Sequence, residues 1–509
     1  MTVYRRIILT GTLRTLSPLH IGTGNEEILS NDNKSNIDEN SSSSESISYN
    51  ALCLDADNQP YIPASSLRGY LRDIISQHQE DALNDLFGLA RQESDNKEDI
   101  NKESGNIGAL RVYDALWGVN QATSQAQLIS QTSINPLTAT AKEHHLLTHA
   151  VVDSNSVFDL TIELDNASQQ QLTLILKALN TLGQEYGGKL GKAKTSGQGS
   201  ISWEHKELKV LTEEKFIKWL EPKNTKSLSA FYQSYLVISE MNTLVEEAKA
   251  QAFVNNSKQI TVTLAAQSPI LINDPKACTE IAKQREKNNK DTEKDKDKNS
   301  ADLLFIPDLL FSQANKQAII PGSSLKGWVR AQCRKILLTL INSADSTLEN
   351  NLDVDAIVNK LFGSTEQQGL IEFNHARASF TEDEIHQQTF TAIDRFTGGV
   401  KPGALYQAEA IWPKEPFSLQ IRYQDNKLKD WMRLLLLFMI RDAAQGDLIL
   451  GWGKSKGYGR LILSSTQYSD WQSLYKTLDA QTLEAWQNDL DKVLGLQQKM
   501  QENTQEANA

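Results

Sequence analysis

Segments in which apolar and polar residues alternate recur along the chain, and longer segments with apolar residues every three or four positions lie between them. The first pattern is typical of β-strands, and the second is typical of helices that bury one face. In the N-terminal half, the patterns predict strands at Arg6–Leu16, Gly108–Ala115, Val157–Leu164 and Gln198–Trp203, and helices at Ser65–Phe87 and Ser168–Tyr186. In the C-terminal half, they predict strands at Gln259–Ala266, Gly369–Ala376, Gly403–Trp412 and Gly457–Leu463, and helices at Ser323–Ile341 and Lys427–Ala444.

The two halves repeat one another. Ile62–Arg72 (IPASSLRGYLR) and Ile320–Arg330 (IPGSSLKGWVR) are identical at seven of eleven positions. Other shared segments follow in the same order in both halves, and the predicted order of elements is β-α-β-β-α-β in each. This order predicts an α+β chain with two tandem ferredoxin-like, RRM-like domains.

Composition shifts set the expected domain boundaries. We expect a first domain at 1–207 with a disordered insertion near 25–50, and a helical linker at 208–257. A second domain is expected at 258–469 with a charged insertion near 280–302, and a C-terminal helix with a polar tail at 470–509.

Charge and cysteine usage narrow the class of protein. The chain has 52 Lys and Arg against 64 Asp and Glu, so a protein that coats nucleic acid with its whole surface is disfavoured. The basic residues recur within the repeated segments, so a local basic groove stays compatible with this charge. The three cysteines form no CxxC pair, which favours a reducing, cytoplasmic environment. The longest apolar run, Leu434–Ile440, is far shorter than a membrane span of roughly 20 residues, so we expect a buried helix and no membrane partner.

The repeated motif has the chemistry of an anion site. Ser65 and Ser323 are expected helix N-caps, and a helix start with free N–H groups, hydroxyls and cations attracts phosphate. The glycine inside each motif, Gly69 or Gly327, costs helix propensity and would permit a close approach by a backbone or a ligand. A capped helix with a solvated basic face is the alternative. The expected phosphate-binding residues are Ser65, Ser66, Arg68, Arg72, Ser323, Ser324, Lys326 and Arg330.

Three further segments are candidates for binding. Lys194 and Lys454 lie in glycine-rich segments (191–203 and 451–463) that could surround a phosphate or form a tight, solvent-exposed hairpin. Neither segment matches a Walker A loop. The segment 392–410, with Lys401 between glycines, predicts a protruding hairpin with an apolar, basic tip. In the first half, His145 and His149 have helical spacing, but they lack further ligands at metal-binding distances, and a polar loop is the favoured interpretation.

At this point the chain resembles the RAMP superfamily, the backbone subunits of type III CRISPR effector complexes. The resemblance rests on SPLHIGTG at 17–24, both IPxSSL[RK]G motifs, two LFG turns (86–88 and 361–363), IDRFTG at 393–398, and both glycine segments. Two such domains in one chain resemble the fused backbone subunit of a type III-D complex.

The resemblance implies a function. Each domain would bind CRISPR guide RNA along its phosphate backbone through the motif residues named above, with Lys194, Lys401 and Lys454 as further contacts. The hairpin would kink the duplex formed with complementary target RNA, within a complex of other CRISPR effector subunits. An aspartate in the loop before the motif would promote cleavage of the target with a divalent metal ion, expected to be Mg²⁺.

The aspartate is where this chain departs from the family's pattern, because insertions expand both loops. Asp308 lies close to the expected place in the second copy, and Asp38 keeps an Ile-Asp dipeptide in the first. These two are the candidate catalytic and metal-binding residues. Two alternatives stay open: a structural guide-binding subunit without catalysis, and a metal-independent endoribonuclease that processes guide RNA.

Overall fold

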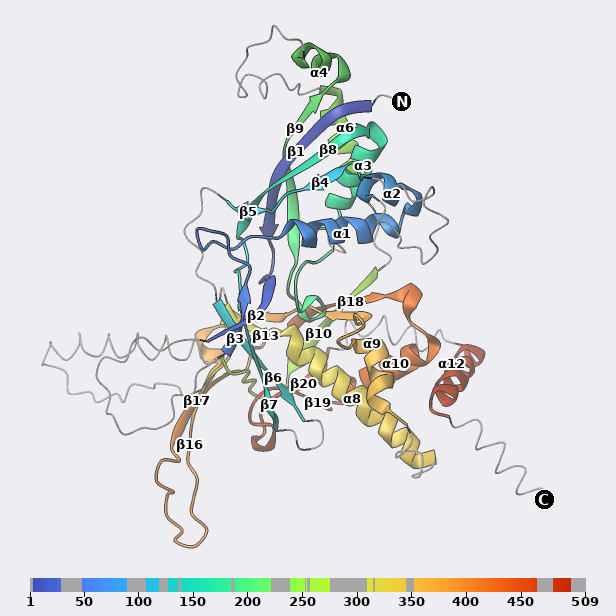
Figure 1. Ribbon diagram of the computed structural model, residues 1–509. Coiled ribbons are helices and arrows are strands. Elements are labelled where there is room, and N and C mark those ends of the chain that lie inside the picture. Colours follow the sequence, from blue (N-terminus) through green and yellow to red (C-terminus); the bar gives the residue numbers. More distant parts are fainter. Residues whose placement is uncertain are drawn as a thin grey trace, which may run out of the picture. The chain divides into compact units, whose positions relative to one another are not determined.

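The computed structural model in Figure 1 describes most of the chain. The described residues are 3–28, 48–88, 107–118, 127–135, 138, 140–184, 188–220, 239–251, 253, 257–274, 309–314, 316–344, 352–464 and 479–495. Asp38 and Asp308 lie outside them. The chain divides into two compact units: unit 1 comprises 1–194 and 198–255, and unit 2 comprises 195–197 and 256–509.

The central sheet of unit 1 has the strand order β4-β8-β1-β9, and all neighbours are antiparallel. Its strands are β1 (Val3–Thr15), β4 (Leu110–Val112), β8 (Val157–Ser168) and β9 (Ile201–Leu211), with β5 (Leu116–Trp117) also paired to β8. Alternation along β1 buries Ile7, Leu9 and Leu13 completely on one face. That face meets the helices.

Two helices form the core of unit 1 with this sheet (Figure 1). The helix α1 (Ala64–Ser76) buries Leu67, Leu71, Ile74 and Ile75 at helical spacing, and α3 (Gln169–Leu179) begins at a capping box formed by Ser168 and Gln171. The helix α6 (Ser239–Ala250) packs on α3 and buries its apolar residues in the same core.

The predicted helix Ser65–Phe87 is wrong in its middle. It is divided into α1, a 3-10 turn η1 (Glu80–Ala82) and a short α2 (Leu83–Phe87). The polar run from Ser76 to Asp81 offers no apolar side chain to the core, so packing does not hold a continuous helix there. Beyond β9 lies α4 (Glu213–Leu220), whose Phe216 packs on Ile8 and Leu211.

A second sheet in unit 1 has the order β2-β3-β7-β6. Its strands are β2 (Gly22–Ile28), β3 (Ser48–Leu52), β6 (Gln127–Ile134) and β7 (Ala141–Val151). Strands β6 and β7 form an antiparallel hairpin, so the expected polar loop around His145 and His149 is wrong.

The central sheet of unit 2 has the order β12-β13-β15-β18-β10-β20-β19, with β14 paired to β18. The strands are β10 (Ser257–Ala266), β12 (Gln313–Ala314), β13 (Gln317–Ile320), β14 (Ile371–Phe373), β15 (Ala376–Ser379), β18 (Phe417–Gln424), β19 (Leu448–Ile449) and β20 (Arg460–Leu463). The order β14-β18-β10-β20 within it matches β4-β8-β1-β9 of unit 1. A smaller sheet holds β11 (Leu309–Leu310), β17 (Tyr406–Ile411) and β16 (Ile385–Phe390).

The position of one strand in unit 2 differs from the expectation. The segment expected as a core strand, Gly403–Trp412, contains β17 of the smaller sheet, and β18 takes the central place. The alternation of Phe417, Leu419, Ile421 and Tyr423 is the signal for β18 that the prediction overlooked.

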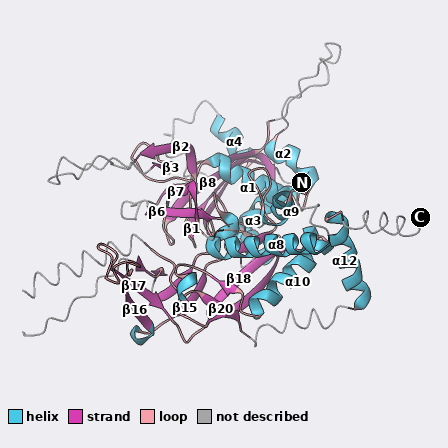
Figure 2. Ribbon diagram, turned by 90° about the horizontal axis from the view of Figure 1, so that it is seen from below, coloured by secondary structure: helices cyan, strands magenta, loops and turns pink. Residues whose placement is uncertain are grey.

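Helices cover one face of this sheet, and α8 (Gly322–Ala344) and α10 (Asp430–Ala444) lie side by side along it (Figure 2). The expected buried helix at Leu434–Ile440 is confirmed, because α10 buries almost all of this run. The helix α9 (Val354–Phe362) packs on α8, and α12 (Ala480–Val493) packs on α10. None of the helices within the described residues is long and apolar enough to cross a membrane.

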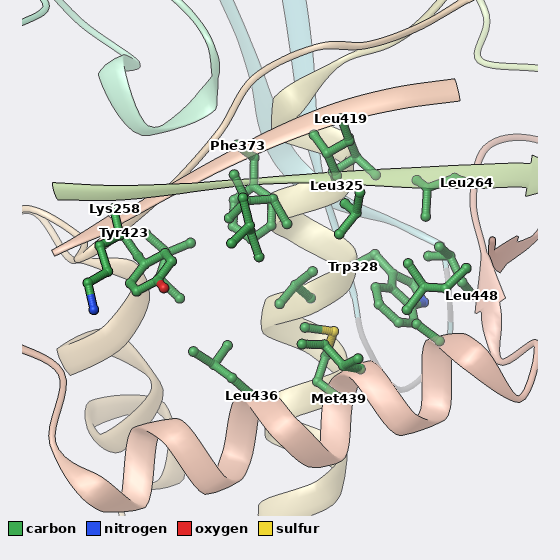
Figure 3. A pocket seen from close by; sticks show the side chains of 18 of the residues that line it. Lys258, Leu264, Leu325, Trp328, Phe373, Leu419, Tyr423, Leu436, Met439 and Leu448 are labelled. Atoms are coloured by element: carbon green, nitrogen blue, oxygen red, sulfur yellow. The ribbon is translucent and has the colours of Figure 1, made fainter. Parts of the chain in front are cut away.

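The layers of unit 2 enclose a cavity of about 280 Å³ between β10, β18, α8 and α10 (Figure 3). Apolar side chains line most of it, including Leu264, Trp328 and Met439, and Lys258 and Tyr423 lie at one end. The cations Lys258 and Arg433 are both paired with Asp425 there. The cavity therefore belongs to the apolar core and offers no unpaired charge from these two residues to a nucleic acid.

Candidate nucleic-acid interface

The two motif helices begin without the expected serine caps. The N-cap of α1 is Pro63, and Ser65 is its second residue; α8 begins at Gly322, and Ser323 is likewise its second residue. Side chains from the short connections that follow β4 and β14 cap them instead. The first N–H of α1 (Ala64) donates to Asp114 Oδ1 at 2.7 Å, and that of α8 (Gly322) donates to His375 Nδ1 at 3.0 Å.

These two caps occupy the same place in the repeat. Asp114 and His375 are the seventh residues of two matching sequence blocks, GALRVYDA (Gly108–Ala115) and GLIEFNHA (Gly369–Ala376). The match between these blocks is the sequence signal that could have identified the two capping residues. A carboxylate in the first copy and an imidazole in the second give the two helix starts different electrostatics. An anion near α1 meets the negative charge of Asp114, whereas none stands at the equivalent position beside α8.

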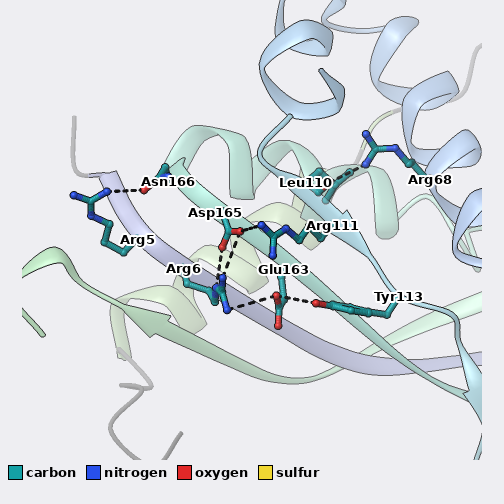
Figure 4. Close-up of polar contacts among 9 residues, drawn as sticks. All are labelled: Arg5, Arg6, Arg68, Leu110, Arg111, Tyr113, Glu163, Asp165 and Asn166. Atoms are coloured by element: carbon teal, nitrogen blue, oxygen red, sulfur yellow. Dashed lines mark hydrogen bonds and ion pairs between the residues drawn. The ribbon is translucent and has the colours of Figure 1, made fainter. Parts of the chain in front are cut away.

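Arg68 is turned toward the backbone of unit 1 (Figure 4). Its guanidinium donates to the carbonyl oxygen of Leu110 at 2.7 Å and to that of Phe87 at 2.8 Å, and it lies 5.2 Å from the centroid of the Phe87 ring. Since Phe87 ends α2, the cation also meets the negative end of that short helix. Arg68 thus joins α1 to α2 and β4.

The other predicted cations of the motif differ in their surroundings. Arg72 is exposed and has no polar partner among the described residues. Arg330 donates to Asn359 Oδ1 at 2.7 Å, which joins α8 to α9. Burial is the main cause that lowers the pKa of Lys326 to about 8, and the charge of Arg330 lowers it further. The Lys326 Nζ donates a hydrogen bond to Thr195 Oγ1. Thr195 belongs to the short segment 195–197 that is part of unit 2. Ser65 is exposed, and Ser66, Ser323 and Ser324 are half-buried.

The motif glycines are open to solvent. A Cβ added at Gly69 or at Gly327 would meet no atom within 4 Å, and both residues are exposed. No described part of the protein therefore needs a glycine at either position. The space above each one is available to a ligand.

The glycine-rich segments have the opposite property. A Cβ at Gly199 would come within 2.0 Å of the Leu190 carbonyl oxygen, and one at Gly459 within 1.9 Å of that of Leu450. The N–H groups of both glycines donate to the prolines of the Ser-Pro segments, Pro18 and Pro269, at 2.9 and 2.8 Å. These two glycines are therefore required by close packing within the protein. Lys194 and Lys454 lie in the short turns that precede them, η2 (Lys194–Ser196) and η6 (Lys454–Lys456).

The predicted protruding hairpin of the second copy is confirmed. Strands β16 and β17 pair in antiparallel fashion and project from unit 2 (Figure 1), and their connection carries Lys401 on the exposed surface. Apolar side chains at its tip are also exposed: Phe396 by 98%, Ile393 by 67% and Val400 by 64%. Such side chains at the end of a hairpin form a surface that a partner would cover.

Asp394 orders the tip. Its Oδ1 accepts bonds from the N–H groups of Thr397 and Phe396, both at 2.9 Å, and from the Thr397 hydroxyl at 3.2 Å. These bonds, with those from Thr397 foremost, lower the pKa of Asp394. Gly398 and Gly403 take positive φ, at 66° and 71°, which the reversal of the chain requires.

In the first copy, His145 and His149 do not lie one turn apart on a helix, because both are in the strand β7. Residues four apart on a strand are separated by about 13 Å and cannot hold one ion together. His145 is exposed, whereas His149 is buried against His20, with ring centroids 5.2 Å apart. Among the described residues, no group of three or more His, Cys, Asp or Glu could hold a metal ion. The two candidate metal-binding residues, Asp38 and Asp308, lie outside these described residues.

The buried histidine pair has few polar contacts. His20 Nδ1–H donates to the Ala150 carbonyl at 2.6 Å, and His149 Nε2–H donates to Gln198 Oε1 at 3.3 Å. His149 Nδ1 has no hydrogen-bond partner among the described residues. Burial is the main cause that lowers the pKa of both histidines, so both are neutral at pH 7.

The sheet face of unit 1 opposite α1 and α3 carries ion pairs (Figure 4). Asp165 accepts from Arg6 at 2.8 Å and pairs with Arg111 at 2.7 Å, and Glu163 accepts from the Tyr113 hydroxyl at 3.0 Å. A phosphate at this face would meet two carboxylates beside the arginines. The motif helix, the glycine segment and the hairpin are better candidates for contact with nucleic acid.

Comparison with known families decides the class of protein. The RAMP superfamily profile matches residues 12–202 and 279–462, which together make up most of the chain. The chain belongs to the RAMP superfamily. No curated protein matches it significantly. The two matched regions are consistent with a tandem, double-domain RAMP protein, and membership supports a CRISPR-associated subunit.

Replacing Arg68 of this RAMP protein with alanine removes two charge-assisted hydrogen bonds, so we expect it to destabilise unit 1 by about 2 to 4 kcal/mol. Arg72→Ala, one turn along the same helix, should change stability by less than about 0.5 kcal/mol, because that side chain is exposed. Urea unfolding followed by circular dichroism measures both. Equal stability of the two variants would contradict the role assigned to Arg68.

The histidine pair predicts acid sensitivity in the first RAMP copy. Below pH of about 6.5 the unfolded chain binds protons that the buried histidines resist, so the free energy of unfolding should fall as the pH drops. The double variant His20→Leu/His149→Ala introduces the residues found at the equivalent positions of the second copy, Leu271 and Ala408. It should reduce the dependence of the free energy of unfolding on pH, to which each histidine contributes up to about 1.4 kcal/mol per pH unit. His205, whose pKa burial also lowers, keeps a residual slope. Unfolding measured from pH 7.5 to 5 would refute the assignment if the slopes matched.

Proposed function

We propose that this RAMP protein is a backbone subunit of a type III CRISPR ribonucleoprotein and that both copies bind guide RNA along its phosphate backbone. Fusion of two copies in one chain favours an arrangement like that of type III-D. The partners are then the guide RNA, complementary target RNA and other effector subunits.

Strand order supports a ferredoxin-like domain in each unit. The orders β4-β8-β1-β9 and β14-β18-β10-β20, with helices between the first and second and between the third and fourth of these strands along the chain, are those of a split β-α-β unit. The same elements thus carry the same motifs in both copies.

The observation that carries the proposal is the open space above Gly69 and Gly327. Each glycine costs its helix about 1 kcal/mol relative to alanine, and no described atom packs on it. Serine hydroxyls precede it and a cation follows it within one turn: Ser65, Ser66 and Arg72 in α1, and Ser323, Ser324 and Arg330 in α8. A sugar-phosphate backbone that crosses the helix closely at this point would account for the glycine, the hydroxyls and the cation together.

The hairpin of the second copy supports contact with a duplex. Its tip combines exposed apolar side chains with Lys401 and Arg395, so it could insert between base pairs while the cations meet phosphates. A wedge of this kind would kink a duplex formed by guide and target RNA.

Cleavage of target RNA is the second part of the proposal. Asp38 and Asp308 are the carboxylates that would hold a divalent ion, expected to be Mg²⁺, which when bound stabilises charge on a phosphate. Both acids lie in the two expanded loops that precede the motif helices in the sequence.

The open glycines give a direct test of guide binding. Gly69→Leu and Gly327→Leu should leave the unfolding midpoint unchanged or raised, because leucine favours a helix, but should weaken RNA binding by roughly tenfold or more, or about 1.4 kcal/mol. Binding of labelled guide RNA to the full chain measures this. As a control, Gln170→Leu places the same side chain at an exposed position on α3. Unchanged RNA affinity in both glycine variants would refute the proposed contact.

The two acids are tested in the assembled complex with guide, target and Mg²⁺. Asp38→Ala and Asp308→Ala, singly and together, should slow target cleavage by about a hundredfold or more while guide binding is kept. Asp447→Ala, at an exposed acid of unit 2, is the matched control. Unchanged cleavage by the double variant would refute the catalytic role of Asp38 and Asp308 and would favour a subunit that only binds the guide RNA.

A further inference from the structure

Four aromatic side chains cluster where the hairpin of unit 2 joins the glycine-rich segment. Phe390 ends β16 and Tyr406 begins β17, and their rings stack with centroids 5.2 Å apart and planes at 15°. Trp452 meets the Phe390 ring edge-on at 5.3 Å and the Tyr458 ring at 5.5 Å. This aromatic cluster (Phe390, Tyr406, Trp452 and Tyr458) lies entirely within unit 2.

Lys456 fills the centre of the aromatic cluster. Its Nζ lies 4.7 Å from the centroid of Phe390, 4.7 Å from that of Trp452 and 5.0 Å from that of Tyr406, and it donates to the Tyr406 hydroxyl. Three rings around one ammonium form an aromatic cage. The occupant is a side chain of the protein itself.

The cage can be reached from solvent. Lys456 is exposed, and Phe390, Tyr406 and Trp452 are only half-buried, so displacement of the lysine would uncover ring faces. Tyr458 is buried, and its hydroxyl is bonded to Gln388, so it forms the base of the cage.

The first copy has no such cage. The shared glycines and the strand registers make Gln131, Leu147, Lys192 and Ser196 the counterparts of Phe390, Tyr406, Trp452 and Lys456. Since the fold at this place does not require aromatic residues, the cage is a property of the second copy alone.

We propose that the aromatic cluster is a stacking site for one unpaired RNA base, which enters as the Lys456 ammonium moves out to a neighbouring phosphate. This deepens the proposed function and depends on it. Stacking of a base on an aromatic side chain contributes about 1 to 3 kcal/mol, which is similar in size to three exposed cation–π contacts at about 0.5 to 1 kcal/mol each. The exchange is favourable because the displaced ammonium gains a charge-assisted hydrogen bond to the phosphate. Every base has a π-face, so the site accepts any sequence, as backbone binding does.

The experiment is a double-mutant cycle on the full chain. The probes are a single-stranded RNA and an RNA of equal length whose nucleotides lack their bases. Trp452→Leu keeps apolar bulk but removes the indole, and we expect it to weaken binding of the intact RNA by about 5- to 150-fold. The abasic RNA, which can reach the phosphate-binding residues but cannot stack, should bind wild type and variant equally.

Controls separate stacking from folding. Trp412→Leu makes the same substitution at the other end of the hairpin, where the tryptophan is 47% exposed and outside the cluster, and should change neither affinity. Phe390→Leu is a second variant in the cage and should repeat the effect of Trp452→Leu, even if one of them impairs folding.

The outcomes are distinct. If wild type binds both RNAs and the cage variants weaken both equally or neither, the cluster is only a structural joint between hairpin and glycine segment, and the stacking site is refuted while guide binding stands. If wild type binds neither RNA, the proposed function fails and the stacking site fails with it.

Discussion

Each copy depends on one close approach of two backbones. The N–H groups of Gly199 and Gly459 donate to the carbonyl oxygens of Pro18 and Pro269, and each glycine lies so near the carbonyl oxygen of Leu190 or Leu450 that no Cβ would fit. Only glycine combines this contact with a positive φ, which is 80° and 86° at the two positions. The contact holds the turns η2 and η6 against the segments that contain Pro18 and Pro269. The residues after these prolines, Leu19 and Ile270, in turn pair with Val152 and Ile411, which lie at the end of each copy's hairpin.

The backbone contacts are the same in the two copies, but the buried side chains next to them differ. In the first copy, the buried residues His20, His149 and Gln198 lie at or next to the glycine-rich segment; in the second, Leu271, Ala408 and Tyr458 stand at the same positions of the repeat. One copy therefore has a polar, titratable interior there, and the other has aromatic residues around a cation. Gene duplication conserved the backbone contacts and left the side chains between them to diverge, so the two copies need not do the same work.

The sequence predicted most of the strands and helices because apolar periodicity follows directly from burial, and the repeat allowed each copy to check the other. It did not predict the direction of Arg68, because no local pattern tells a solvated arginine from one that bonds the carbonyls of Phe87 and Leu110, which lie 19 and 42 residues away. The histidine spacing failed for a related reason: four residues apart means neighbours on a helix but distant positions on a strand. The aromatic cluster draws on three separate segments, so only the tertiary fold brings it together.

The bonds that Asp394 accepts have a kinetic consequence. A loop that must order itself when it meets a partner loses conformational entropy at that moment, which weakens binding and slows productive encounters. Here the turn is already shaped by three hydrogen bonds to one carboxylate, so the proposed wedge would meet a duplex in a preformed shape. The same hydrogen bonds lower the pKa of Asp394, so its carboxylate stays charged at a lower pH than a free aspartate does.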